Sequence, residues 1–127
     1  MDGVLVLAHG SRRKETEETL DLLVRKAKQK TGNELIHSAF LQFSEKDLNM
    51  GIDGLVSEGA TSIVVVPLFI FEGVHVTEDI PNELELIRNK YPNIDIKLSE
   101  SLGADDRIAD IIADRVMGLR DTVKDMY

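Results

Sequence analysis

The chain contains no cysteine, so it has neither a disulfide framework nor a metal site built from thiolates. No apolar run approaches the length of a membrane span, and acidic Asp2 followed at once by a strand-like run is unlike a signal peptide. Basic residues are in the minority, with 15 Lys and Arg against 23 Asp and Glu, which argues against a nucleic-acid partner. We expect a soluble, cytoplasmic protein with no membrane or nucleic-acid partner.

Several sequence patterns are also missing. There is no Walker motif and no G-x-G-x-x-G, so nothing favours nucleotide binding. There is no internal repeat, low-complexity stretch or interdomain linker. A hydrophobic fraction of 43% is enough for a core, and residues 1–127 are therefore predicted to form a single domain.

Apolar runs alternate with segments of helical period along the chain. Strands are predicted at residues 3–8, 34–42, 62–67 and 94–98. Helices are predicted at 13–30, at 48–58, from 79 or 80 to 91, and after Gly103. This alternation predicts an α/β fold, a three-layer α-β-α sandwich around a four-stranded parallel sheet. The strand order 2-1-3-4 is expected, because right-handed crossovers then cover both faces.

The helix boundaries follow from capping residues. Gly32 is expected to end the first helix, and residues 44–47 resemble a capping box that starts the second. Asp105 is the expected cap of the last helix. That helix carries an apolar stripe, which we expect to be buried, made of Ile108, Ile111, Ile112, Val116 and Leu119.

Two histidines follow two predicted strands. His9 comes directly after the first strand, and His75 follows the third after a short loop. With the order 2-1-3-4, these strands are neighbours, and ligands of such sheets bind at the carboxyl ends near this point. Imidazole binds cobalt, nickel, iron or zinc, and it also exchanges protons near neutral pH. The pair can therefore hold a divalent metal, accept protons, or do both. His37 lies within a predicted strand and is expected to be an ordinary structural residue.

The residues beside the two histidines have open interpretations. Gly10 and Gly73 allow a close approach of backbone to a ligand, or serve turn geometry. Arg12 is a solvated residue at a helix start, or meets carboxylates of a ligand. Phe69, Ile70 and Phe71 line a flat apolar pocket or a subunit contact, and at least one of them is expected to pack in the core.

Two segments resemble the sirohydrochlorin chelatase family, in its short single-domain form called CbiX-small. They are Leu7-Ala8-His9-Gly10-Ser11-Arg12 and the run from Pro67 to Pro81, which contains Gly73-Val74-His75-Val76-Thr77-Glu78-Asp79. Ser101-Leu102-Gly103 stands where the family commonly has Pro-Leu-Gly. The resemblance covers essentially the whole chain.

The resemblance implies insertion of a divalent metal into sirohydrochlorin without ATP, for cobalamin or related tetrapyrrole biosynthesis. Cobalt is the first choice of metal, nickel and iron are alternatives, and the metal is a substrate rather than a bound cofactor. His9 and His75 are implied as the catalytic residues, acting as metal ligands, proton acceptors or both. The implied assembly is a homodimer. Substrate contacts are expected from Gly10, Ser11, Arg12, Phe69, Phe71, Gly73 and Val74.

The chain also departs from the family pattern. Gln42 stands where many relatives have a glutamate after the second strand, and an amide cannot act as a base. Glu72 can supply a carboxylate there or be a solvated loop acid. Two further classes of function stay open: a tetrapyrrole or metal carrier without catalysis, and a phosphate-binding or signalling domain that needs neither histidine.

Overall fold

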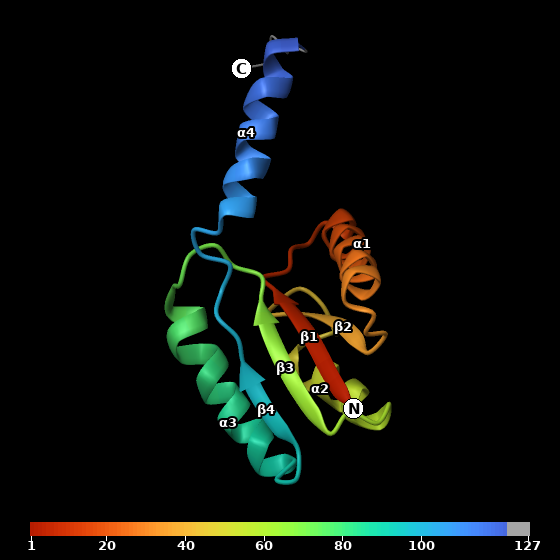
Figure 1. Ribbon diagram of the computed structural model, residues 1–127. Helices are drawn as coiled ribbons and strands as arrows, with labels where there is room; N and C mark the ends of the chain where they lie inside the picture. Colours follow the sequence, from red (N-terminus) through yellow and green to blue (C-terminus); the bar gives the residue numbers. More distant parts are fainter. Residues whose placement is uncertain (122–127) are drawn as a thin grey trace.

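The computed structural model describes the backbone of residues 1–121, with side chains except at positions 75, 76 and 119–121. Its four strands form one parallel sheet in the order β2-β1-β3-β4, which confirms the predicted topology (Figure 1). The elements in chain order are β1 (Asp2–Ala8), α1 (Lys14–Thr31), β2 (Ile36–Phe40), α2 (Leu48–Ser57), β3 (Ser62–Pro67), a π-helical turn η1 (His75–Asp79), α3 (Ile80–Lys90), β4 (Asp95–Leu98) and α4 (Asp106–Asp121).

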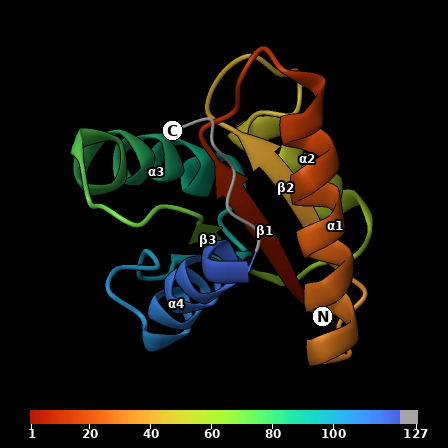
Figure 2. The same ribbon diagram turned by 90° about the horizontal axis from the view of Figure 1, so that it is seen from above.

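The sheet is covered differently on its two faces. On one face α2 and α3 pack on the sheet, and the buried cluster there takes residues from all four strands: Leu5, Ala39, Val65 and Ile96. On the other face α1 covers β1 and β2 through a smaller cluster of Leu20, Val24, Ile36 and Phe40. Figure 2 shows α1 and α4 on one side of the sheet and α2 and α3 on the other.

Capping residues set several of the helix ends. Gly32 adopts a left-handed conformation (φ 71°) at the end of α1, as predicted. The carboxylate of Asp47 accepts a hydrogen bond from the Met50 N–H at 2.9 Å and caps α2. The prediction that the 44–47 segment starts a helix with Ser44 as its cap was wrong, because the Ser44 hydroxyl accepts from the Lys46 N–H in a turn that precedes the helix.

Asp105 caps α4, as predicted. Its carboxylate accepts hydrogen bonds from the backbone N–H of Arg107 at 2.9 Å and from the Arg107 guanidinium. The guanidinium hydrogen bonds, followed by the backbone one, hold the pKa of Asp105 well below its usual range. The start of α4 therefore carries an ionised carboxylate, which also suits the helix dipole.

The predicted burial of the α4 stripe was wrong for three of its residues, whereas Ile108 is partly buried. Ile111, Ile112 and Val116 are 53%, 60% and 53% exposed, and α4 forms no packing interface with the strands and helices described here (Figure 1). Leu119 belongs to the same predicted stripe, but its side chain lies outside the described residues. None of the helices in the described part of the chain is long and apolar enough to cross a membrane.

Candidate active site at the carboxyl edge of the sheet

His9 follows β1 at the carboxyl edge of the sheet. β1 and β3 are parallel neighbours in which Leu7 is paired with Pro67, so the segments after both strands start side by side. The His9 side chain is exposed, and its ring lies edge-on to Phe69, with 4.8 Å between ring centres and 79° between ring planes. Phe69 itself is only 8% exposed. A buried aromatic ring from the loop after β3 therefore supports the imidazole that follows β1.

His75 begins the turn η1, which leads directly into α3. The helical winding thus starts earlier than the predicted start of the helix at residue 79 or 80. The turn is held by the Thr77 N–H and hydroxyl, which both donate to the Gly73 carbonyl at 3.0 Å. π-helical turns are frequent at functional sites. The side chain of His75 lies outside the described residues, so its approach to His9 stays a prediction.

Gly10 is required by the backbone next to His9. It has a φ of +88°, and a Cβ at this position would lie 2.2 Å from the Gln42 carbonyl oxygen. The Gln42 N–H donates to the His9 carbonyl at 3.1 Å. The observed close approach at Gly10 is therefore to the protein's own backbone. Gly73, by contrast, has open space where a Cβ would lie, with no atom within 4 Å.

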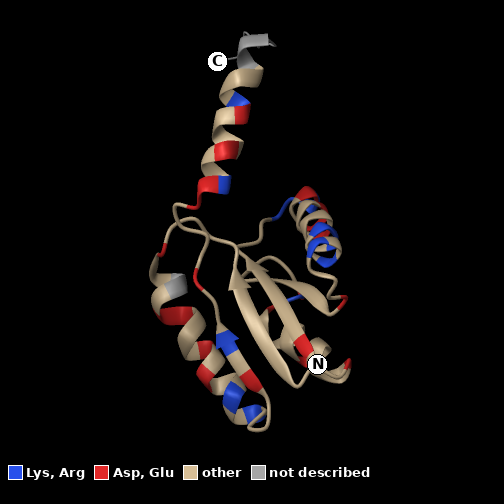
Figure 3. Ribbon diagram, viewed as in Figure 1, with Lys and Arg blue, Asp and Glu red and all other residues tan. Residues whose placement is uncertain are grey.

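A cation–aromatic pair lies beside His9. The Arg12 guanidinium carbon is 5.1 Å from the centre of the Phe43 ring, and Phe43 is 52% exposed. Figure 3 shows the basic segment that contains Arg12 between β1 and α1. Ser11 forms a turn there, accepting from the Arg13 N–H at 3.1 Å and sharing a hydrogen bond with Thr16. Sequence reasoning missed Phe43, although an aromatic just after a predicted strand was the available signal.

The loop after β3 presents apolar side chains to solvent. Phe71 is 84% exposed, Val74 62% and Ile70 47%. Glu72 lies among them, and its carboxylate accepts a hydrogen bond from the Ser101 hydroxyl at 3.3 Å. Exposed apolar residues grouped in one loop are typical of a surface that binds an apolar ligand or another chain.

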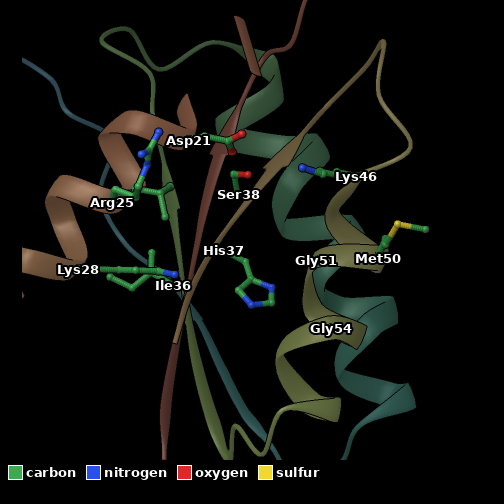
Figure 4. Close-up of a pocket in the computed structure, with 11 residues that line it drawn as sticks. Asp21, Arg25, Lys28, Ile36, His37, Ser38, Lys46, Met50, Gly51 and Gly54 are labelled. Carbon is green, nitrogen blue, oxygen red and sulfur yellow. The ribbon is translucent and has the colours of Figure 1, made fainter. Parts of the chain in front are cut away.

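A cavity of about 580 Å³ lies away from this edge, on the open side of β2 between α1 and α2 (Figure 4). It includes none of the predicted site residues; its lining is Asp21, Val24, Arg25, Lys28, Ile36, His37, Ser38, Lys46, Met50, Gly51 and Gly54. The His37 Nε2 lies 2.5 Å from a Glu58 carboxylate oxygen. That contact supports the expectation that His37 is a structural residue.

The described side chains contain no group of three or more His, Cys, Asp or Glu able to hold a metal. The segments after β1 and β3 include two side chains of types that can ligate a metal, the imidazole of His9 and the carboxylate of Glu72. An imidazole in an open coordination sphere can bind an incoming metal or accept a proton. The arrangement can therefore bind a metal transiently, or accept a proton, next to an apolar surface.

The family model described as CbiX matches residues 3–119. The sirohydrochlorin cobaltochelatase of Methanocaldococcus jannaschii is 30% identical, with 93% of this chain and 99% of that protein covered. The sirohydrochlorin ferrochelatase of Priestia megaterium is 31% identical, with 91% of this chain but 44% of that protein covered. This chain thus matches the archaeal protein over nearly its whole length and spans less than half of the bacterial one.

Solved structures show the same relation. A putative cobalamin biosynthesis CbiX protein from Marinobacter aquaeolei has a TM-score of 0.81 at 25% identity, with 96% of this chain and 99% of that chain covered. The sirohydrochlorin chelatase SirB from Bacillus subtilis subspecies spizizenii, in complex with cobalt, has a TM-score of 0.86 at 27% identity. The match covers 93% of this chain and 50% of the SirB chain.

Proposed function

Because the chain belongs to the CbiX family, we propose that it inserts a divalent metal into sirohydrochlorin without ATP, with cobalt as the first metal. Relatives named sirohydrochlorin cobaltochelatase match it over nearly their whole length. The observation that carries the proposal is the position of His9, exposed at the carboxyl edge and supported by the Phe69 ring.

Metal insertion needs groups that accept protons from the macrocycle and groups that replace the water bound to the metal ion. Metal insertion removes two pyrrole N–H protons and strips water from the incoming ion. A neutral imidazole at His9 can bind the ion in place of water, or accept a pyrrole proton. Edge-on contact with Phe69 restricts the orientation of the ring. We assign His75 as the partner of His9 in these two roles.

The substrate would lie along the exposed loop after β3. Phe71 and Val74 offer apolar contact area for a flat macrocycle. Arg12 would bind one of its carboxylates, since a guanidinium forms two parallel hydrogen bonds with a carboxylate. The Phe43 ring holds that guanidinium at the edge. Gly10 and Ser11 set the course of the backbone between His9 and Arg12.

A change in the absorbance spectrum of sirohydrochlorin tests the proposal. The macrocycle is mixed with cobalt, nickel or iron at matched free-metal concentration, with and without protein. Faster insertion with protein than without it supports a chelatase, and the metal with the largest acceleration identifies the preferred ion. Iron and nickel stay candidates, since imidazole ligands discriminate weakly among these ions. Absence of acceleration for all three metals overturns the proposal.

His9 is tested against a matched histidine. His9→Ala should reduce insertion by about 100-fold or more, which is the scale at which a positioned proton acceptor contributes. His37→Ala is the control, because His37 pairs with Glu58 in a different part of the molecule. Equal rates for the two variants would remove His9 from the mechanism.

A paired assembly that completes the site and a cytoplasmic location stay predictions.

A further inference from the structure

β2 is an edge strand of the sheet, so one of its two sides has no neighbouring strand. Hydrogen bonds at both of its ends show which residues face β1. The Val4 N–H donates to the Leu35 carbonyl at 3.0 Å, and the Leu41 N–H donates to the carbonyl that ends β1, that of Ala8, at 2.9 Å. Because backbone groups alternate in direction along a strand, the odd-numbered residues of the range 35–41 bond to β1 and the even-numbered ones face away.

Ile36 and Ser38 carry the free backbone groups of this edge. Phe40 also faces away from β1, but its N–H donates to the Lys46 carbonyl at 2.7 Å, in the connection to α2. The N–H and carbonyl groups of Ile36 and Ser38 have no such partner among the described residues. A row of free edge groups is a template on which a further strand can form.

The cavity of about 580 Å³ lies over this free edge (Figure 4). Ile36 and Ser38 lie at its base, with α1 on one side and α2 on the other. Its volume is within the range of about 300–1,000 Å³ that is typical of ligand sites. Because a helix flanks the edge on each side, the space favours a single extended segment over the edge of another folded sheet.

The α1 wall of the cavity is charged. Arg25 and Lys28 line it, and neither forms an ion pair with a carboxylate in the described part of the chain. Asp21 lies on the same flank, one turn earlier. Lys46 lines the cavity from the connection to α2, and its Nζ lies 4.0 Å from a Glu17 carboxylate oxygen. In a chain with a net charge of -8, two cations without a carboxylate partner favour an acidic ligand.

The α2 wall differs in being apolar and low. Met50, Gly51 and Gly54 line it, and Met50 is 54% exposed. The two glycines have no side chains to fill the space. Gly51 also lies close to the sheet, since a Cβ there would be 2.6 Å from a leucine side chain. Small apolar side chains can therefore lie against this wall.

We propose that an extended peptide in which acidic and apolar residues alternate binds this cavity by adding a strand to β2. Its backbone exchanges hydrogen bonds with Ile36 and Ser38. Successive side chains of a strand point to opposite faces, so the acidic ones meet Arg25 and Lys28 while the apolar ones lie against Met50. None of the residues assigned to metal insertion lines the cavity, so the proposal does not depend on chelatase activity.

The charges of the α1 wall set the number of acidic residues. Arg25 and Lys28 are separated by about 4.5 Å along the helix axis, and alternate residues of a strand are about 7 Å apart. The long side chains of both cations can cover this difference, so two acidic residues separated by one apolar residue match the wall. Asp21 lies about 6 Å further along the axis and would repel a third acidic residue.

Fluorescence anisotropy with a labelled, end-capped peptide Val-Glu-Val-Glu-Val tests the proposal. The full chain should bind it more tightly than it binds Glu-Glu-Val-Val-Val, which has the same composition and charge. Arg25→Ala/Lys28→Ala should raise Kd about tenfold, because two ion pairs are lost. Lys26→Ala/Lys30→Ala is the matched control, since it removes two cations of α1 that do not line the cavity, and its Kd should stay near that of the wild type.

The same measurement can overturn the proposal. Failure to bind the alternating peptide contradicts it, as does equal binding of the two peptides. Equal Kd values for the two double variants would show that the peptide is attracted by the general charge of α1 rather than held in the cavity, and would also contradict it.

N-methylation of the peptide separates strand addition from attraction by charge. In an added strand, either the glutamate N–H groups or the valine N–H groups face β2. Methylation of the set that faces β2 should therefore abolish binding, whereas methylation of the other set should be tolerated. Loss of binding with both methylated peptides, or with neither, contradicts strand addition.

Discussion

Gly10 allows the backbone conformation beside the proposed catalytic histidine. The variant Gly10→Ala measures how much the fold depends on a glycine at this position. The substitution would place a Cβ 2.2 Å from the Gln42 carbonyl oxygen, in a backbone conformation with φ of +88°. The left-handed conformation costs about 1–2 kcal/mol for a residue with a Cβ. Relief of the clash would also break the hydrogen bond from the Gln42 N–H to the His9 carbonyl, worth about 1 kcal/mol. We expect a loss of about 2–3 kcal/mol in the free energy of unfolding.

Gly32→Ala is the control for this prediction. Gly32 also has a positive φ, of +71°, but no atom lies within 4 Å of the position of its Cβ. It therefore reports the backbone cost alone, about 1–2 kcal/mol. Urea unfolding followed by circular dichroism measures both variants, at two protein concentrations because association changes apparent stability.

The two positions differ in their surroundings: a Cβ would clash with the Gln42 carbonyl oxygen at Gly10, whereas it would meet no atom at Gly32. Gly10→Ala should be less stable than Gly32→Ala and should also insert metal more slowly, since its His9 is displaced. Equal losses of stability for the two variants would refute the role of the Gln42 contact. Full insertion activity in a folded Gly10→Ala would refute the link between this turn and His9.

Three further predictions concern packing, pH and substrate binding. Gly51→Ala should destabilise the protein in thermal unfolding, because its Cβ would lie 2.6 Å from a buried leucine, whereas Gly54→Ala has room and should stabilise by up to about 1 kcal/mol. Hydrogen bonds from Tyr91 and a neighbouring lysine lower the pKa of Asp53 in the folded protein. The ionised carboxylate therefore stabilises the fold at pH values above its unfolded-state pKa, near 4, and this stabilisation is lost as pH falls through the folded-state pKa. Urea unfolding should therefore show Asp53→Asn less stable than wild type at pH 7 by up to about 1 kcal/mol, and this difference should shrink as pH falls through the folded-state pKa of Asp53. Arg12→Leu should raise KM for the macrocycle several-fold with little change in kcat, measured by steady-state insertion.

The sheet could be predicted from sequence because each strand has a local signal. Residues 62–67 form a short apolar run and are observed as β3 without a shift. The strand order follows from the handedness of crossovers, which is a property of any L-polypeptide. The placement of His9 at the carboxyl edge needs only the end of β1 and that order.

The features that were missed depend on information outside the local pattern. The stripe of α4 shows which side of the helix is apolar, but it does not show whether that side meets its own sheet or another chain. Five residues in a π-helical turn, His75–Asp79, have no period distinct from a loop. The contact of Arg12 with Phe43 joins segments that come together only after β1 and β2 pair.

The most direct test of the central claim is turnover. Sirohydrochlorin and cobalt are supplied in at least tenfold excess over the protein, and metallated product is counted against time after subtraction of the rate without protein. A catalyst forms many equivalents of product per chain at a constant rate above the uncatalysed one, and His9→Ala removes that excess rate. Product limited to one equivalent per chain, or a rate that His9→Ala leaves unchanged, would contradict the account.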